Sequence, residues 1–410
     1  MALVAARYAL RSTRRNLRRT ALSVAGIGIG CALALFADSF NRGRDRLYSR
    51  AVIDNGVGHL RVVPAGWRRS RDPQLRLAAG NAALAAAREL PGAAVAGARA
   101  RAQALLAMGT RVVAVEMVGV EAEAEQRLDR LARKLRAGRW LRPGERGAAV
   151  LGQAALDRLR AELGDEVLAT AVGSGGTIES AMLTVVGAIA TGSEEMDASL
   201  CRTSLADVEA LTGLAGPAEV TVLLRELAAI PAARSALAAR LPAEDVMTWE
   251  ELTPDFKGHI EQDAAFSRLF TGVILLVVLL GVGSAQLASV LERRREFAVL
   301  TALGTGAGRL VRLLAGEAIL VGLAGAALAL GLALPVLAHL HRTGIDFRSL
   351  MGPGWTFQGV VVEPIIYLDL GAWVLPEALG ISLAATLLAT LWPAWFVART
   401  DPAEALRSLP

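Results

Sequence analysis

A charged stretch, Glu-Arg-Arg-Arg-Glu-Phe-Ala-Val-Leu-Thr-Ala-Leu-Gly at residues 292–304, separates two long apolar runs and decides the fold. The run before it covers residues 268–291 and carries no charge after its first position, and the run after it covers residues 310–338. A helix of roughly 20 apolar residues spans the hydrocarbon core of a bilayer. These two runs therefore predict two transmembrane helices joined by a short charged connection.

Two more apolar runs, 20–40 and 372–398, bring the predicted transmembrane helices to four. The composition agrees, because 53% of the 410 residues are hydrophobic and only 20% are charged, which is unlike a soluble enzyme. A cleavable signal peptide is the alternative for the first run. That run continues past Cys31 to Ala37, however, and this length favours a retained membrane helix.

The arginine bias of short flanking segments orients these helices. The arginine-rich segment 1–19 and the connection 292–309 both belong in the cytoplasm by this rule. Four crossings then return the tail, 399–410, to the same side and leave residues 41–267 and 339–371 outside. We expect residues 1–19 to form an amphipathic helix on the inner membrane surface. An arginine-rich topogenic signal without a fixed shape is the alternative for that segment.

The segment 41–267 is long enough to bury a core of its own. Alternating apolar residues predict strands, and apolar residues at helical spacing predict helices. The predicted strands are 57–63, 111–120, 167–172, 182–189 and 219–224, and the predicted helices are 121–137, 152–163, 204–212 and 232–241. The fold class is therefore a membrane α-helical protein with four transmembrane helices and a large α+β extracytoplasmic domain, in two lobes, inserted between helices 1 and 2.

In the second outer segment, Val360-Val361-Val362 and Ile365-Ile366-Tyr367 are separated by Glu363-Pro364. Two short runs of β-branched residues around a proline predict a small hairpin.

Several kinds of chemistry are excluded. The only lysines are Lys134 and Lys257, and neither follows glycine and precedes serine or threonine, so no phosphate-binding loop of that type exists. The cysteines, Cys31 and Cys201, are assigned to the membrane and to the outer domain, so an internal disulfide is not expected. The histidines have no metal-binding spacing, and His59 is expected at the surface. Because the basic excess collects at cytoplasmic flanks, we expect no nucleic-acid partner and no cofactor bound by this chain.

Because the chain has no nucleotide site of this type, we expect another protein to drive it by binding to its cytoplasmic surface. The connection 292–309 is the candidate for that surface. Phe297, Leu300 and Leu303 fall near one helical face, and a short amphipathic helix can insert into a groove on a partner. The candidate coupling residues are Glu292, Arg293, Arg294, Arg295, Glu296, Phe297, Leu300, Leu303 and Gly304.

Polar and small residues inside the predicted membrane helices form a second candidate group. An intramembrane charge such as Glu317 costs a few kcal/mol unless it faces protein, so pairing with Arg309 or Arg312 is favoured over a proton or substrate site. Gln286 is the other intramembrane polar candidate. The small residues Ala318, Gly322 and Ala326 recur every four positions and predict close helix packing across a dimer seam, although chance in an alanine-rich chain explains them equally well.

The sequence resembles a known family. The run 289–325 and the C-terminal segments 392–394 and 399–407 resemble the FtsX-like permease domain of ABC transporters. Residues 58–62, 118–121 and 150–152 are similar to the extracytoplasmic domain of lipoprotein-releasing (Lol-type) and MacB-type permeases.

The resemblance implies a permease of the mechanotransmission type in a bacterial inner membrane, with its large domain in the periplasm. Two permease chains, as a homodimer or a heterodimer, would work with a separate ABC ATPase subunit that binds ATP and Mg. The connection helix, from Glu296 through the Phe297–Leu303 face, would be the ATPase contact. The substrate would be a lipoprotein or another amphiphile. The chain itself would have no catalytic site.

Two other functions remain open at this stage. A MacB-like efflux permease would work with a periplasmic adaptor, but that type carries a fused nucleotide-binding domain that this sequence lacks. An FtsX-like regulator of a cell-wall hydrolase would have a much smaller external domain. The separate-subunit Lol-type arrangement is therefore the most similar.

Overall fold

The computed structural model describes residues 17–303, 305–352, 355–357 and 360–399. It forms two compact units, which are described separately below. The first consists of Met1–Asp45, Ile260–Ile345 and Ile366–Pro410, and the second of Arg46–His259 and Asp346–Ile365. The predicted surface helix at 1–19 and the predicted tail at 399–410 lie almost entirely outside the described residues.

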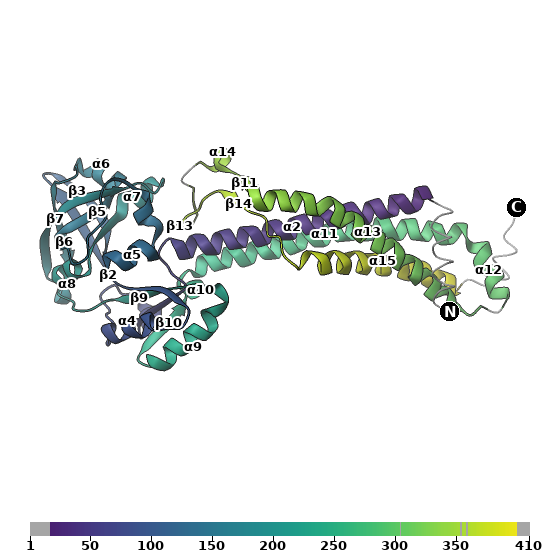
Figure 1. Cartoon of the computed structure of the whole chain (residues 1–410), viewed down its shortest axis with the longest axis horizontal. Helices are drawn as coiled ribbons and strands as arrows, with labels where there is room; N and C mark the ends of the chain where they lie inside the picture. The colour runs from purple at the N-terminus through teal and green to yellow at the C-terminus, as the bar shows by residue number, and fades with distance from the viewer. Residues whose placement is uncertain (1–16, 304, 353–354, 358–359, 400–410) are drawn as a thin grey trace. The chain divides into compact units, whose positions relative to one another are not determined.

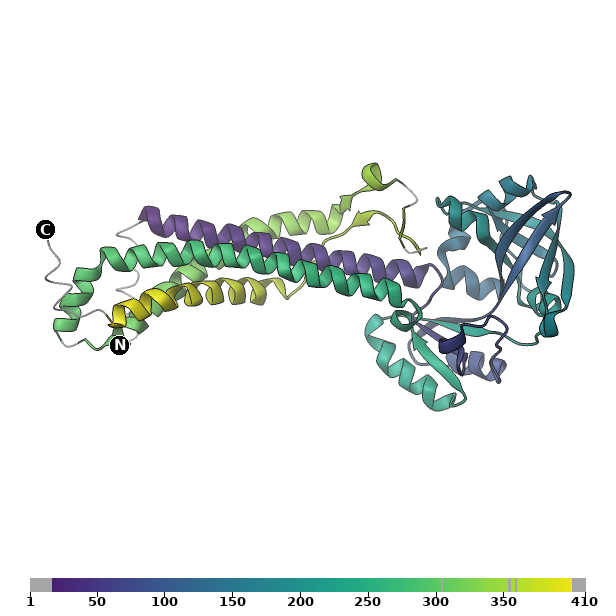
Figure 2. The same ribbon diagram turned by 180° about the vertical axis from the view of Figure 1, so that it is seen from behind.

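Four long helices build the first unit (Figures 1 and 2). They are α2 (Leu17–Asp54), α11 (Pro254–Glu292), α13 (Ala307–Thr343) and α15 (Val374–Arg399). Each contains a stretch long and apolar enough to cross a membrane: Thr20–Asp54, Pro254–Glu292, Gly308–Thr343 and Val374–Trp395. The part of the chain that the structure describes therefore contains four candidate membrane helices, as the sequence predicts.

Two of these helices extend well beyond their apolar runs. Helix α2 continues to Asp54, and α11 begins at Pro254, so both contribute residues to the second unit. Proline suits the first turn of a helix because that turn has no partner for the missing N–H. Hydropathy locates the membrane-embedded part of a helix and not its ends, and for this reason the predicted boundaries at 40 and 268 differ from the helix ends.

Close contacts between small residues and polar side chains hold the four helices together. A side chain at Gly30 of α2 would overlap Val278 of α11. Ser382 Oγ of α15 donates to the carbonyl oxygen of Gly322 on α13 at 2.6 Å. The Cys31 thiol lies 3.7 Å from the carbonyl oxygen of Ala378 on α15. Backbones approach this closely only where a helix face lacks bulky side chains.

A ten-stranded sheet organises the second unit, with the order β10-β1-β9-β2-β3-β8-β5-β7-β4 and with β6 paired to both β2 and β7. The strands are β1 (Leu60–Pro64), β2 (Ala93–Met108), β3 (Arg111–Val120), β4 (Leu135–Gly138), β5 (Ala148–Gly152), β6 (Glu166–Val172), β7 (Ile178–Ile189), β8 (Leu200–Ser204), β9 (Glu219–Leu224) and β10 (Glu244–Thr248). Because β6 joins β2 to β7, the strands β2, β3, β8, β5, β7 and β6 close into a barrel.

Short helices cover this sheet. They are α3 (Trp67–Ser70), α4 (Gly80–Arg88), α5 (Ala122–Leu128), α6 (Gln153–Leu159), α7 (Glu194–Ser199), α8 (Leu205–Thr212), α9 (Ile230–Arg240) and α10 (Trp249–Leu252). Helix α8 begins as its sequence predicts, since the Ser204 hydroxyl accepts the Asp207 N–H at 3.1 Å.

The long strand β2 joins two lobes with separate cores. Its first half pairs with β9, and the apolar residues there pack with α4 and α9. Its second half pairs with β3 and β6, and the barrel interior is filled with residues that include side chains of α6 and α8. The α+β domain with two lobes that the sequence predicts is therefore present, built on a shared strand that the sequence analysis missed.

Two predictions of secondary structure in this unit are wrong. The helix predicted at 121–137 ends at Leu128, because Asp129 caps a 3₁₀ turn at Arg130–Lys134 and β4 follows. The hairpin predicted between residues 360–362 and 365–367 does not form. Strand β13 (Val360–Val361) pairs instead with β12 (Thr356–Phe357), and β14 (Ile365–Ile366) belongs to another two-stranded sheet. The short helix α14 (Arg348–Met351) lies in the same connection.

Candidate functional site

The charged connection of the first unit contains the helix α12 (Arg294–Ala302). It is shorter than the predicted segment 292–309, because α11 continues to Glu292 and α13 begins at Ala307. Arg293 occupies the corner between α11 and α12, and its carbonyl oxygen accepts the Phe297 N–H at 3.1 Å. Gly304, one of the candidate coupling residues, lies outside the described residues.

One side of α12 is buried within the same chain. Phe297 is 4% exposed and packs with Val290 of α11, Leu310 and Leu314 of α13, and Ala394 of α15. Leu300 is half-buried against the same cluster. Phe297, which the sequence analysis assigned to a partner contact, thus packs within this chain and anchors the connection to the bundle.

The other side of α12 is open. Val299 is 48% exposed and Leu303 is 78% exposed, and Arg295 and Ala302 are exposed on the same side. Positions three, four and seven residues apart share one helix face. The available surface is thus the Arg295–Val299–Ala302–Leu303 face, called the α12 outer face below. Sequence reasoning assigned the larger aromatic residue to the contact and so missed Val299.

Arg293 forms an ionic cluster at the α11–α12 corner. Its Nη1 lies 3.0 Å from Oε1 of Glu317 on α13, and its Nε lies 3.2 Å from Oε2 of Glu296. Its guanidinium also stands over the Phe297 ring, 5.2 Å from the centroid. Glu317 has a structural partner of the kind the sequence predicts, but the partner is neither Arg309 nor Arg312. The Arg312 Nε instead donates to the carbonyl oxygen of Gly308 at 3.1 Å.

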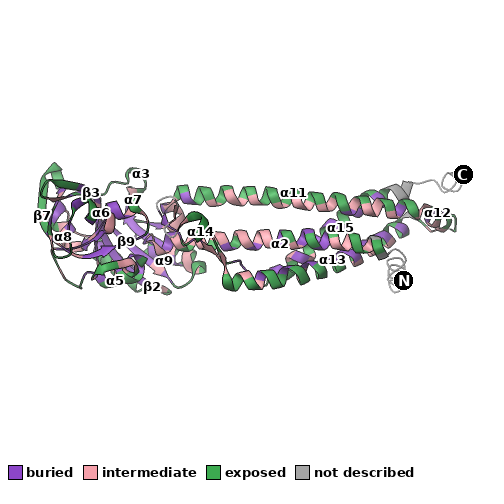
Figure 3. Ribbon diagram, turned by 90° about the horizontal axis from the view of Figure 1, so that it is seen from above, coloured by how far each residue is buried: buried purple, intermediate pink, exposed green. Residues whose placement is uncertain are grey.

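The strip of small residues on α13 faces α15 of the same chain. Ala318 and Ala326 are buried, and a side chain at Gly322 would stand 2.7 Å from Thr386 Oγ1. Close packing of the predicted kind is present at Gly322, against α15 of the same chain. Figure 3 shows α11 exposed along most of its length, and only 11% of its most apolar window is buried. Gln286 lies on this helix and is half-exposed.

The second unit contains a buried network of charges that sequence reasoning missed. Its members lie on different strands and become neighbours only in the folded sheet. Glu219 on β9 contacts Arg61 of β1 and Arg101 of β2, each at 3.1 Å, and Arg101 also lies 2.7 Å from Glu116 of β3. Arg99 of β2 holds Glu125 of α5 with two hydrogen bonds, at 2.8 and 3.0 Å.

These contacts change the protonation of the network. Burial alone would raise the pKa of Glu219, but Arg101, Arg61 and Arg99 outweigh it and lower that pKa to about 2. Burial lowers the pKa of the Arg61 guanidinium to about 10, despite Glu219 beside it. Asp129, deeply buried next to Glu125, has a raised pKa for these two reasons. All the arginines of the network nevertheless stay charged at neutral pH, so the network is a fixed ionic structure.

His59 and Cys201 of this unit are also buried. His59, predicted at the surface, is 7% exposed, and its Nδ1 accepts the Leu224 N–H at 3.1 Å. Burial lowers the pKa of His59 and raises the pKa of the Cys201 thiol to about 12. Both cysteines are free and buried. Neutral imidazole and thiol groups that face the protein interior serve packing and hydrogen bonding.

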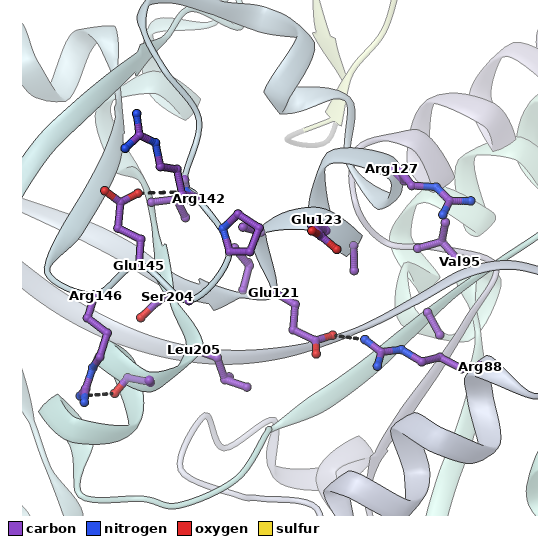
Figure 4. A pocket seen from close by; sticks show the side chains of 18 of the residues that line it. Arg88, Val95, Glu121, Glu123, Arg127, Arg142, Glu145, Arg146, Ser204 and Leu205 are labelled. Atoms are coloured by element: carbon purple, nitrogen blue, oxygen red, sulfur yellow. Dashed lines mark hydrogen bonds and ion pairs between the residues drawn. The ribbon is translucent and has the colours of Figure 1, made fainter.

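A cavity of about 740 Å³ opens in the second unit beside α5 and the first half of β2 (Figure 4). Its charged side chains mostly pair with each other or with backbone groups. Arg88 lies 2.9 Å from Glu121, and Arg127 donates to the carbonyl oxygen of Ala94 at 2.9 Å. Glu145 accepts the backbone N–H of Arg142 at 2.9 Å. Charged side chains of both signs therefore line this cavity.

No metal centre is evident in the part of the chain that the structure describes, because no three His, Cys, Asp or Glu side chains converge there.

Comparisons with known proteins agree with this architecture. The model of the MacB-like periplasmic core domain matches residues 20–240, and the model of the FtsX-like permease C-terminal domain matches residues 268–402. The lipoprotein-releasing system transmembrane protein LolC of Neisseria meningitidis is 26% identical over 319 residues, which cover 74% of this chain and 76% of the relative. LolC of Xylella fastidiosa is 25% identical over 318 residues, 74% of this chain and 75% of the relative.

Two solved structures are similar to part of the chain. The extracellular domain of the noncanonic ABC-type transporter YknZ from Gram-positive bacteria is 15% identical, with a TM-score of 0.35, and the match covers 46% of this chain and 98% of that domain. The periplasmic region of MacB from Actinobacillus actinomycetemcomitans is 13% identical, with a TM-score of 0.37, and the match covers 50% of this chain and 94% of that region.

The family resemblance predicted from the sequence is thereby confirmed. The periplasmic core model alone covers residues 20–240 of 410, more than half of the chain, and the permease model covers the three C-terminal membrane helices. The chain belongs to the MacB-like and FtsX-like family of ABC transporter permeases.

Proposed function

We propose that this chain is the membrane subunit of an ATP-driven machine of the mechanotransmission type, which extracts or moves a lipoprotein-like amphiphile at the outer face of a bacterial inner membrane. A separate ATPase subunit binds ATP and Mg and contacts α12. Both termini and α12 lie in the cytoplasm, and the sheet domain between α2 and α11 lies in the periplasm. A second permease chain completes the complex.

One observation carries the coupling part of this proposal. Helix α12 is anchored on one side, where Phe297 is buried among α11, α13 and α15, and open on the other, where Val299 and Leu303 are exposed. A short helix with one anchored and one open apolar face can transmit a push from a docked partner to the helices behind it. The anchored face explains how the displacement of α12 reaches the bundle.

The lipoprotein part rests on relatives. The relatives reported above are named for lipoprotein release and match along three quarters of their length, at about 26% identity. The MacB-like efflux permease is the second candidate, because the periplasmic core model and a solved MacB region both match this chain. An FtsX-like regulator of a cell-wall hydrolase remains the third, and the ten-stranded domain disfavours it on size.

The test uses the full chain co-purified with an ABC ATPase subunit and placed in proteoliposomes that contain a triacylated lipoprotein. We expect ATP-dependent release of the lipoprotein to a soluble acceptor. Leu303→Asp puts a charge on the α12 outer face, and we expect it to abolish complex-stimulated ATPase activity and release while membrane insertion stays normal. An unchanged rate contradicts the docking of an ATPase on this face.

A matched control replaces an exposed leucine elsewhere. Leu350→Asp changes a 79% exposed side chain in the connection before α15 and should leave the ATPase rate unchanged. Export of a small amphiphile with an adaptor, but no lipoprotein release, would favour the MacB-like alternative. Co-purification with a hydrolase and no transport would favour the FtsX-like one.

A further inference from the structure

The corner between α11 and α12 depends on a single residue. Helix α11 ends at Glu292 and α12 begins at Arg294, so Arg293 alone forms the break (Figure 1). Its backbone, with φ −98° and ψ 11°, leaves the helical geometry, and its carbonyl oxygen accepts the first hydrogen bond of α12. Whatever holds the Arg293 side chain therefore also fixes the direction in which α12 leaves α11.

Glu317 of α13 holds that side chain. Both carboxylate oxygens of Glu317 accept from Nη1 of Arg293, at 3.0 and 3.2 Å. The two side chains are each 12% exposed, so water screens the pair weakly. Glu296, which contacts the same arginine at Nε, is 36% exposed and more strongly screened. Of the two carboxylates, Glu317 is therefore the one that orients the guanidinium.

The position of Glu317 makes loss of its ion pair with Arg293 energetically costly. It lies inside Gly308–Thr343, one of the apolar stretches that can cross a membrane. An ionised carboxylate in such a helix is costly unless it pairs with a charge or faces protein. Arg293 provides that charge.

The ion pair and the apolar anchor act on the same face of α13. Leu310, Leu314 and Glu317 follow at spacings of four and three, which places them along one side of a helix. Phe297 packs on the two leucines, and its ring lies below the guanidinium that Glu317 binds. Helix α12 is thus held to α13 at two neighbouring points. The packing of Phe297 fixes the distance between the two helices, and the Arg293–Glu317 ion pair fixes the orientation of α12.

We propose that Glu317 is a positioning residue for coupling: through Arg293 it fixes the angle of α12 on α13, so that a displacement of α12 moves the membrane helices and is not lost in rotation about the corner. This inference rests on the proposed function, in which an ATPase pushes on α12. It assigns Glu317 a role in transmission and none in contact with substrate or nucleotide.

Two measurements on the full chain test the role of Glu317. Spin labels on Ala302→Cys in α12 and Leu332→Cys in α13 report the distance between these helices, and the native Cys31 and Cys201 are buried and do not compete for label. The parent chain should give one narrow distance distribution. Glu317→Gln should broaden it, because the amide no longer holds the guanidinium by charge. In complex with the ATPase subunit, the same variant should still bind but lose on the order of tenfold in stimulated ATPase rate.

Two further variants distinguish a positioning role of Glu317 from a general loss of structure. Arg312→Gln removes another charge from the same helix, five residues away, and should keep both the narrow distribution and the rate. The exchange of the pair, Arg293→Glu with Glu317→Arg, should restore both. A narrow distribution and a parent-like rate in Glu317→Gln overturn the inference. A parent chain that binds no ATPase subunit contradicts the proposed function instead, and the distance measurement then still decides the role of Glu317.

Discussion

At the scale of single residues, the second unit, which is the predicted outer domain, buries charged side chains as well as apolar ones. Arg99 and Glu219 are 2% and 3% exposed, yet both are ionised and hydrogen-bonded within the network that joins the two lobes. Buried ion pairs add little net stability compared with apolar residues, but removing one partner is costly because the other stays buried and unpaired. Such a network favours one arrangement of the strands over others that would separate the charges.

Glu219→Gln should destabilise the outer domain by about 3–5 kcal/mol, because Arg61 and Arg101 lose their shared carboxylate. The same change alters the response to acid. The pKa of Glu219 in the folded chain is about 2, below its ordinary 4.5, so the ionised form is favoured by folding. Its contribution is complete above pH 4.5 and is lost as the pH falls toward 2.

Thermal unfolding of the full chain in detergent, followed between pH 7 and pH 3, measures both effects. The parent chain should lose stability below pH 4.5, and Glu219→Gln should start lower and change less across that interval. Glu179→Gln, on an exposed position of β7, serves as the control and should follow the parent curve. Identical curves for parent and Glu219→Gln would show that the network does not stabilise the fold.

The role of a polar residue could be predicted from the sequence only where its hydrogen-bond partner is a few positions away along the chain. Ser204 caps α8 through Asp207, three residues on, and the spacing alone predicts it. Glu317 and Arg293 are 24 positions apart, and the choice among several nearby arginines depends on how the connection folds back. The two sides of α12 could not be told apart from sequence for the same reason, because a short helix between two membrane helices can bury apolar groups on either side. Phe297 lies on the side that packs within the chain.

At the scale of elements, α13 and α15 pack against each other through small residues and hydroxyl groups. Gly322 admits Thr386 and Leu383, and Ser382 donates to its carbonyl oxygen. In an apolar environment helices gain little from burying hydrocarbon, so close packing and such hydrogen bonds provide the association energy.

Gly322→Leu should therefore separate α13 from α15 and destabilise the bundle by about 1–3 kcal/mol, the usual cost of overpacking. A Cβ at this position stands 2.7 Å from Thr386 Oγ1 and 3.4 Å from the carbonyl oxygen of Ser382. Gly316→Leu on the same helix is the matched control, because nothing lies within 4 Å of a Cβ there. Melting temperatures in detergent compare the two variants, and equal values would contradict the packing role.

Strand β3 (Arg111–Val120) was predicted with both ends correct, and β2 (Ala93–Met108) was missed entirely. The difference lies in side chains. Half of the residues of β3 are valine, which is typical of strands, whereas half of the residues of β2 are alanine, which is depleted in strands. Its strand conformation is imposed by β9, β3 and β6 on its two sides, and such long-range pairing is invisible in a local pattern.

At the scale of the whole molecule, the two units are connected through helices that belong to both. Helix α2 ends among the residues of the second unit, at Asp54, and α11 begins there, at Pro254. The four candidate membrane helices differ in how much they pack within the chain. In the most apolar 18-residue stretch of α11, 11% of the residues are buried, compared with 33% in the corresponding stretches of the other three helices. Helix α11 therefore offers the largest surface for the second permease chain of the proposed complex.

Val277→Cys should form a covalent permease dimer in native membranes under mild oxidation, because this side chain is 65% exposed on α11 and the native cysteines are buried. Val282→Cys is the matched control, since its side chain is 3% exposed within the same helix and should give no cross-link. Electrophoresis without reductant distinguishes the outcomes by mass. A band at twice the mass of this chain indicates a homodimer, and a band of another mass that contains a related permease indicates a heterodimer. Monomer alone in both variants would contradict a dimer interface at this face of α11 and would favour one on the exposed sides of α2 or α13.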